Sequence, residues 1–161
     1  MTAYPPPPGP TADAPPAPPV APPLAALWRR LLARIIDGVL VGAVTAVVTV
    51  WWADPARSTG EVWIGLVGPV LYCVYDALMM ERQGGQTLGK KALRVRVAVL
   101  ADGGVPQGAT AWTRAAVFTL PNIVSCLGEL FSLLNVLWCT WDRPYKQCLH
   151  DKAAHTVVVA A

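Results

Sequence analysis

The sequence predicts an all-α integral membrane protein with two full transmembrane helices, a bent or paired third membrane segment and a small cytoplasmic β element. Of the 161 residues, 54% are apolar and 14% are charged, against about 25% charged in typical soluble proteins. All seven tryptophans lie at or near the ends of long apolar segments, where an indole ring keeps its N–H close to lipid headgroups. Too little polar sequence remains to enclose these segments in a soluble shell.

Residues 1–26 form a proline-rich tail before the membrane domain, which we place at residues 27–159. The tail holds eleven of the sixteen prolines and a single charged residue, Asp13. Proline fixes φ and removes hydrogen-bond donors, so we predict an extended, disordered cytoplasmic segment. It is either a solvated spacer, which we favour, or a docking strip for an aromatic-lined groove.

The first predicted helix covers residues 27–52 and carries unusual charges at its start. Ile35–Trp52 approaches the roughly 20 apolar residues needed to cross hydrocarbon. Arg30, Arg34 and Asp37 are spaced four and then three residues apart, which places them on one helical face. Charges at lipid depth are costly and mark paired or functional groups.

The second predicted helix covers residues 62–80 and carries Asp76 in its inner half. It runs antiparallel to the first helix, so Asp37 and Asp76 fall at similar depth. We therefore expect these two carboxylates to face each other with the arginines between them. A stripe of small residues at four-residue spacing, Gly38, Gly42 and Ala46, permits close helix contact.

The loop 83–110 is polar and predicts a cytoplasmic β element. Leu93–Leu100 alternates apolar and polar residues, which indicates a strand. The β-branched run Thr156–Ala161 is its expected partner. Cations gather in this loop and before the first helix, so both segments, and with them the N-terminus, are predicted to be cytoplasmic. The net charge of +3 then reflects topology and anionic lipid rather than nucleic-acid binding.

The third membrane segment, 112–141, combines a polar helical face with a length too short for two full crossings. Polar residues recur along it at three- and four-residue steps and predict one polar face: Asn122, Ser125, Glu129, Ser132 and Asn135. The basic residues that follow place the C-terminus in the cytoplasm, yet two full crossings need roughly 40 residues. We predict two shorter, partly inserted helices that bend at Pro121 or Gly128. Glu129 is either a tolerated carboxylate near an interface or part of a cavity lining.

Two motifs suggest chemistry but favour structural interpretations. Residues 84–91, GGQTLGKK, resemble a phosphate-binding loop, but Lys91 replaces the final hydroxyl and the loop follows a helix. We interpret it as a helix stop followed by a lipid-facing basic patch. Cys148, His150, Asp151 and His155 match no familiar metal-ligand spacing. We expect Asp151 to cap or pair locally with an arginine, and we expect no enzyme activity, cofactor or metal.

Four ordered blocks resemble the RDD family of membrane proteins, which is named for one arginine and two aspartates. The blocks, which together span about residues 27–159, are RRLLARIIDG at 29–38, GQTLGK at 85–90, LRVRV at 93–97 with DGG at 102–104, and LHDKAAHTVVV at 149–159. The proline-rich tail resembles that of bacterial members. The final block departs from the family pattern at His155, where glycine commonly precedes the threonine.

The resemblance implies a multi-pass protein of the bacterial cell membrane, with Arg30, Asp37 and Asp151 as the named residues and Asp142 as an alternative to Asp151. It also implies transport of small ligands or ions, an activity for which so short a chain would need a homo-oligomer or a larger complex. Arg34, Asp76, Glu129 and Asn122 are the further intramembrane polar candidates. The alternative is a non-catalytic membrane adaptor that uses the proline-rich tail for docking.

Overall fold

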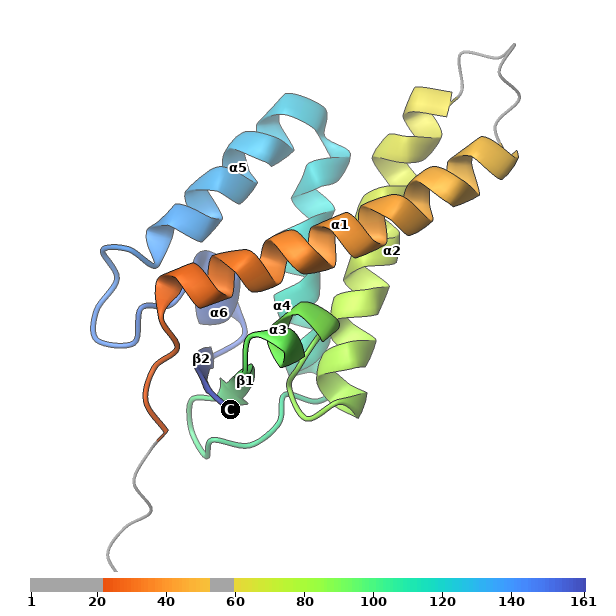
Figure 1. The fold of residues 1–161 in the computed structure, drawn as a ribbon. Coiled ribbons are helices and arrows are strands. Elements are labelled where there is room, and N and C mark those ends of the chain that lie inside the picture. The colour runs from red at the N-terminus through yellow and green to blue at the C-terminus, as the bar shows by residue number, and fades with distance from the viewer. Residues whose placement is uncertain (1–21, 53–59) are drawn as a thin grey trace, which may run out of the picture.

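The computed structural model describes residues 22–52 and 60–161, and four helical segments dominate it. Helix α1 (Leu27–Trp52) and helix α2 (Gly60–Arg82) run in opposite directions. Helix α4 (Ala109–Thr119) passes behind α1, and helix α5 (Ser125–Trp138) turns back from the end of α4 at an angle to it (Figure 1). These bounds agree with the helices predicted at 27–52 and 62–80.

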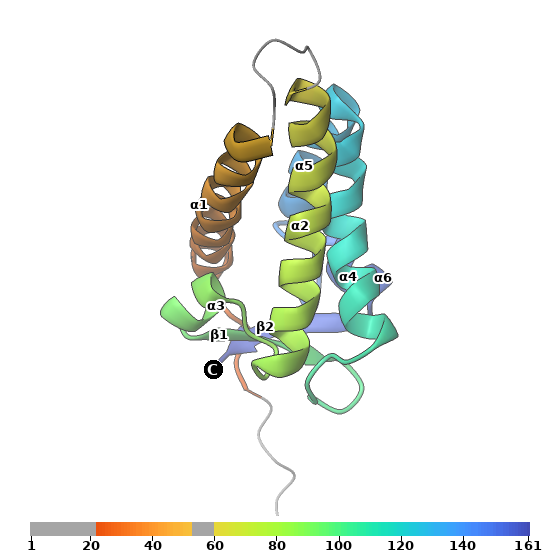
Figure 2. The same ribbon diagram turned by 90° about the vertical axis from the view of Figure 1, so that its right-hand side faces the viewer.

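The short elements gather at the end of the molecule where α1 begins and α2 ends (Figure 2). They are helix α3 (Leu88–Ala92), strand β1 (Val95–Val99), helix α6 (Leu149–Ala153) and strand β2 (Thr156–Ala160). The two strands are antiparallel and pair Val95 with Ala160 and Val99 with Thr156. The predicted pairing of these two segments is confirmed. It places the C-terminus at the same end as the start of α1.

Residues 22–26, the last part of the predicted tail, lie alongside β2 instead of forming a free spacer. Leu24 makes an isolated antiparallel bridge with Val159. The amide of Ala25 donates to the carbonyl of Val158, and the amide of Ala160 donates to the carbonyl of Pro23. The rest of the predicted tail, residues 1–21, lies outside the described residues.

The predicted third segment is two helices, as expected, and Pro121 marks the bend between them. A single 3₁₀ turn, Leu120–Ile123, joins α4 to α5 with Pro121 in its first turn. Gly128 is not at the bend but inside α5. A β-carbon there would collide with the backbone of Pro121 and Asn122. Gly128 therefore lets α5 fold back tightly against the turn.

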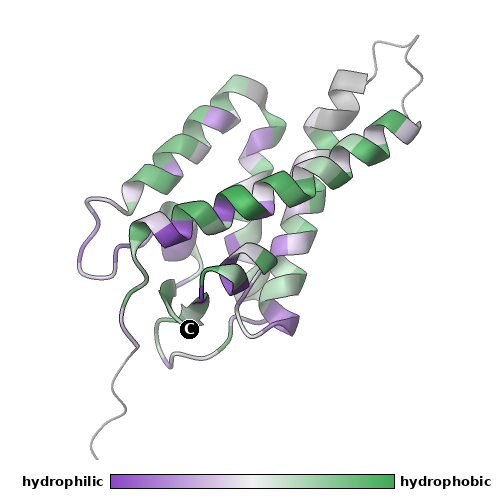
Figure 3. Cartoon of the chain, in the orientation of Figure 1, coloured by the Kyte–Doolittle hydropathy of each residue, from purple (hydrophilic) through white to green (hydrophobic). Residues whose placement is uncertain are grey.

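Much of the apolar surface of the long helices faces outward. Among the described residues, α1 is the one helix that is long and apolar enough to cross a membrane, over Leu27–Trp51. Val39 is 68% exposed on α1 and Leu127 is 70% exposed on α5. Figure 3 shows that hydrophobic residues dominate both helices. Exposed apolar area of this extent requires a lipid or protein environment.

Candidate functional site

A cluster of charged side chains lies inside the end of the molecule where α1 begins and α2 ends. It is centred on Asp76, which has no exposed surface. The Asp76 carboxylate lies 2.9 Å from Lys90 Nζ, 3.3 Å from Arg34 Nη1 and 3.7 Å from Arg114 Nη1. These residues come from α1, α2, α3 and α4, so one carboxylate joins four elements. The expected pairing of Arg34 with a carboxylate of the second helix is therefore present.

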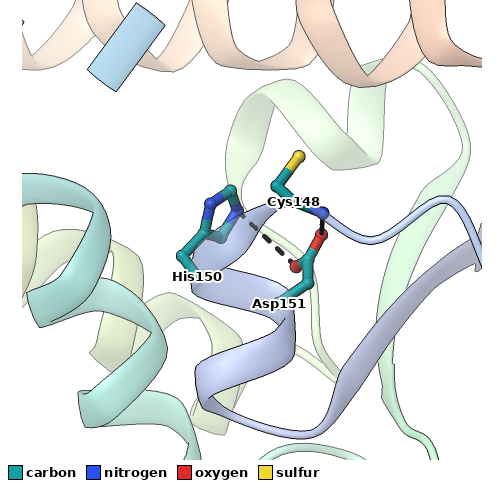
Figure 4. Close-up of side chains that lie close together, drawn as sticks. All are labelled: Cys148, His150 and Asp151. Carbon is teal, nitrogen blue, oxygen red and sulfur yellow. Dashed lines mark hydrogen bonds and ion pairs between the residues drawn. The ribbon is translucent and has the colours of Figure 1, made fainter. Parts of the chain in front are cut away.

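Asp151 is the second carboxylate of this cluster, and it sits in the first turn of α6. Its Oδ1 accepts hydrogen bonds from Arg114 Nε at 2.9 Å and Arg114 Nη2 at 2.6 Å. Its Oδ2 accepts from the backbone amide of Cys148 at 3.2 Å, which caps the helix (Figure 4). Burial raises the pKa of Asp151, but the attraction of Arg114 and the hydrogen bonds that the carboxylate accepts outweigh it and keep the carboxyl ionised.

His150 lies between the two arginines and remains uncharged. Its Nε2 is 3.3 Å from an Nη2 atom of both Arg34 and Arg114, and its Nδ1 is 2.8 Å from Asn135 Oδ1. Burial, reinforced by the arginines, lowers the pKa of His150 well below its usual value. An imidazole that donates from Nδ1 can accept these arginine hydrogen bonds at Nε2.

Asp37 is buried as expected, but its partners are neutral donors. Its Oδ1 accepts from the Tyr75 hydroxyl at 2.9 Å and from the amide of Gly89 at 2.8 Å. Its Oδ2 accepts from the hydroxyl of Thr87, the N-cap residue of α3, at 2.5 Å. Among the described residues no arginine pairs with Asp37, so the expected arrangement of two carboxylates around the arginines is wrong for this residue. Through its hydrogen bonds with Thr87 and Gly89, Asp37 instead holds α3 against α1.

Arg30 also has a different role from the expected ion pair. Its guanidinium donates to three backbone carbonyls: Ala25 at 3.1 Å, Lys146 at 2.6 Å and Val158 at 2.9 Å. These carbonyls belong to the segment before α1, the loop before α6 and strand β2. Arg30 therefore ties the start of the first helix to the C-terminal elements.

The cluster also contains Lys90 and Arg114. Sequence reasoning did not predict them as site residues and placed both on the cytoplasmic surface. Lys90 is 3% exposed and Arg114 is 1% exposed, so the expected lipid-facing basic patch is wrong at Lys90, although Lys91 is exposed. Burial lowers the pKa of Lys90 to about 8, with Asp76 opposing the shift, and the ammonium remains charged at neutral pH. Thr87, a helix-capping residue three positions before Lys90, was the available signal for α3.

The predicted polar face of the third segment is divided by the bend. Asn122 accepts a hydrogen bond from Ser132 at 2.8 Å across the turn, and Asn135 reaches the charged cluster. Glu129 is exposed on the outer side of α5. Asp142, the alternative family aspartate, pairs with Lys152 at 2.5 Å and accepts from the amide of Gln147, outside the cluster.

The side chains of Cys148, His150 and Asp151 lie close enough together to suggest a metal site, because their candidate ligand atoms fall within 4.8 Å of one another. The surrounding charges oppose this. Arg114 donates a hydrogen bond to Asp151 Oδ1, and the guanidinium groups of Arg34 and Arg114 both contact the Nε2 atom of His150. A cation would have to displace both arginines, so these residues do not fit a metal ion. His155 is exposed and forms the left-handed turn after α6, with φ of 50°.

A groove of about 580 Å³ extends from the charged cluster along α1. Its floor is the small-residue face of α1, and its walls come from α2 and from α4 with the 3₁₀ turn. The hydroxyls of Thr45 and Thr49 bond to carbonyls within α1, so these side chains present methyl groups to the groove. Arg34 closes one end, with its guanidinium 4.0 Å from the centre of the Phe118 ring.

The model of the family described as "RDD family" matches residues 24–155. This match covers α1 to α6 and includes the groove and the charged cluster. No curated protein and no solved structure matches the chain.

Proposed function

The chain belongs to the RDD family, and from this premise we propose that it is a non-enzymatic, multi-pass membrane protein that binds and transports a small amphipathic anion. The main support for this proposal is the groove beside α1. Its volume of about 580 Å³ falls within the range of about 300–1,000 Å³ for small-molecule sites. Its lining is apolar except near Arg34, Tyr72, Thr119 and Asn122.

The ligand class follows from the arrangement of charge in the groove. Arg34 Nη1 is buried and has no hydrogen-bond partner among the described residues, although Asp76 is 3.3 Å away. A carboxylate or phosphate at this end of the groove would accept from that N–H. A single hydrocarbon chain would then lie against the glycines and the threonine methyl groups of α1. Asp37, Asp76 and Asp151 are engaged elsewhere, which argues against carboxylates as carriers of protons or cations.

The proposed topology places both termini in the bacterial cytoplasm. Helices α1 and α2 cross the bilayer, and α4 and α5 enter it as a shorter hairpin. Helix α2 has 23 residues, long enough at about 1.5 Å per residue to span roughly 30 Å of hydrocarbon. The sheet, α3 and α6 then lie at the cytoplasmic interface, where lysines and arginines contact anionic lipid.

Transport requires more helices than one chain supplies, so we propose that copies assemble into a homo-oligomer. The small-residue stripe of α1 supports a second candidate function, a membrane adaptor. A β-carbon at Gly38 or Gly42 would meet no atom of the described residues within 4 Å, so these two glycines are not used for packing within that part of the chain. A helix of a partner protein would compete with the ligand for the same groove.

We expect Gly42→Phe to weaken ligand binding by filling the groove. The probe is a dansyl-labelled undecanoate added to the protein in lipid nanodiscs, and the measurement is its fluorescence titration. Binding should weaken by roughly tenfold or more, because the phenyl ring occupies the space of the hydrocarbon chain. The uncharged methyl ester of the probe should bind the wild type more weakly than the carboxylate does.

Gly65→Phe is the matched control. Gly65 also has open space around it, but it lies on α2 outside the groove lining. Normal probe affinity in the Gly42→Phe variant would contradict ligand binding in the groove. Intact probe binding without flux of the probe in proteoliposomes would favour a binding protein over a transporter. Loss of an assembly in Gly42→Phe, with no probe binding to the wild type, would favour the adaptor.

A further inference from the structure

A small cavity separate from the groove lies within the charged cluster, between α1, α3 and α6. Its volume is about 50 Å³, and a single water molecule needs roughly 10–15 Å³. It therefore has room for a few waters or one small ion. Four cationic side chains and one carboxylate contribute to its lining: Arg30, Arg34, Lys90, Arg114 and Asp151.

The ionised groups around this cavity do not balance. Arg34, Lys90 and Arg114 supply three positive charges, and Asp76 and Asp151 supply two negative charges, which leaves one positive charge. If Arg30 and Asp37 are added, four cations face three carboxylates and the remainder is again one. His150 is neutral and does not change this count. Cys139 also lines the cavity, and its hydrogen bond with Cys148 together with the nearby Arg30 lowers its pKa to about 7, so its thiolate offsets the surplus only in part at neutral pH. An uncompensated charge costs several kcal/mol when it is removed from water, so the cluster favours a counter-ion.

Hydrogen-bond donors remain for such an ion. Lys90 has three N–H groups and makes one hydrogen bond with a side chain among the described residues, to Asp76. Lys90 contributes to the lining of the cavity. The unused donors of Lys90 and the charge surplus therefore lie at the same small cavity.

We propose that this cavity binds one small monovalent inorganic anion, such as chloride, which neutralises the cluster and stabilises the contact of α3 and α6 with the long helices. The inference goes beyond the groove ligand, because the ion would be a structural component and not cargo. The small size of the cavity excludes a lipid headgroup with its attached chains. Asp76 and Asp151 provide the repulsion that limits the site to one negative charge.

The test compares thermal unfolding midpoints of the full chain in detergent in sodium chloride and in sodium gluconate at equal ionic strength. Wild type should unfold at a higher temperature in chloride, with a saturable dependence on chloride concentration. In Lys90→Gln the amide can still donate to Asp76, but the surplus charge is gone, and the chloride effect should disappear. Lys91→Gln, the neighbouring exposed lysine, is the control and should retain it.

A second variant keeps every charge but removes the space. Val136 contributes to the cavity lining from α5, and Val136→Phe should raise the chloride concentration needed for half-maximal stabilisation by roughly tenfold. Leu134→Phe, on the exposed side of the same helix, should not. Equal midpoints of wild type in the two salts would overturn the proposal and leave only water in the cavity. A chloride effect that persists unchanged in both Lys90→Gln and Val136→Phe would also overturn it.

Discussion

Asp76→Asn is expected to destabilise the protein by about 3 to 5 kcal/mol, the usual cost of removing one partner from a buried ion pair. The change leaves Arg34, Lys90 and Arg114 facing Asp151 alone, with Asp76 fully buried between them. Asparagine has nearly the same volume, so the effect reports charge and not a cavity. The thermal unfolding midpoint in detergent should fall by roughly 10 °C.

Asp102→Asn is the control for this experiment. It makes the same chemical change at a carboxylate that is exposed in the turn after β1, and its effect should stay within about 0.5 kcal/mol. An unchanged midpoint for Asp76→Asn would mean that the carboxylate is hydrated in the folded protein and that the cluster is not a buried unit.

Gly89→Ala is expected to cost about 3 kcal/mol, at the upper end of overpacking effects. A β-carbon at this position would lie 3.0 Å from Asp37 Cγ and closer still to the carbonyl oxygen of Ala33. Both obstacles belong to α1, one of them to its backbone, so α3 would have to move away. That movement would break the hydrogen bonds from Thr87 and Gly89 to Asp37. The midpoint of thermal unfolding measures the loss.

Gly38→Ala is the matched substitution on the other side of this contact region. Its β-carbon would meet nothing within 4 Å in the described part of the chain, and alanine favours the helix interior over glycine by roughly 1 kcal/mol. We expect this variant to be as stable as wild type or slightly more stable. If Gly89→Ala were as stable as Gly38→Ala, the close approach of α3 to α1 would be wrong.

The long elements were predictable because their signals are local. Long apolar runs predicted the two long helices, and the alternation of apolar and polar residues predicted a strand of the sheet. Pro121 marked the bend because proline disrupts a continuing helix. Helix α3 was missed because five residues are too few to produce a periodic pattern, although Thr87 carried a capping signal.

The membership of the charged cluster was only partly predictable. Helical spacing correctly placed Arg34 on the face that meets α2, and the expected pairing of Asp151 with an arginine is present. Spacing along α1 could not reveal that the loop after α2 returns to supply donors for Asp37. The charge of Lys90 and Arg114 was assigned to topology, because cations near membrane helices usually face the cytoplasm. Their burial depends on tertiary contacts that join four separate elements.

Photolabelling of the full chain in nanodiscs with a fatty acid that carries a diazirine on its chain tests most directly whether the groove holds a ligand. Peptide mass spectrometry then locates the label along α1. We predict labelling of groove-lining residues, such as Val41 and Thr45, and its loss in Gly42→Phe. Label confined to outward-facing residues such as Val39 and Val47, with no change in Gly42→Phe, would show that the fatty acid contacts α1 only as bulk lipid and would contradict a bound ligand.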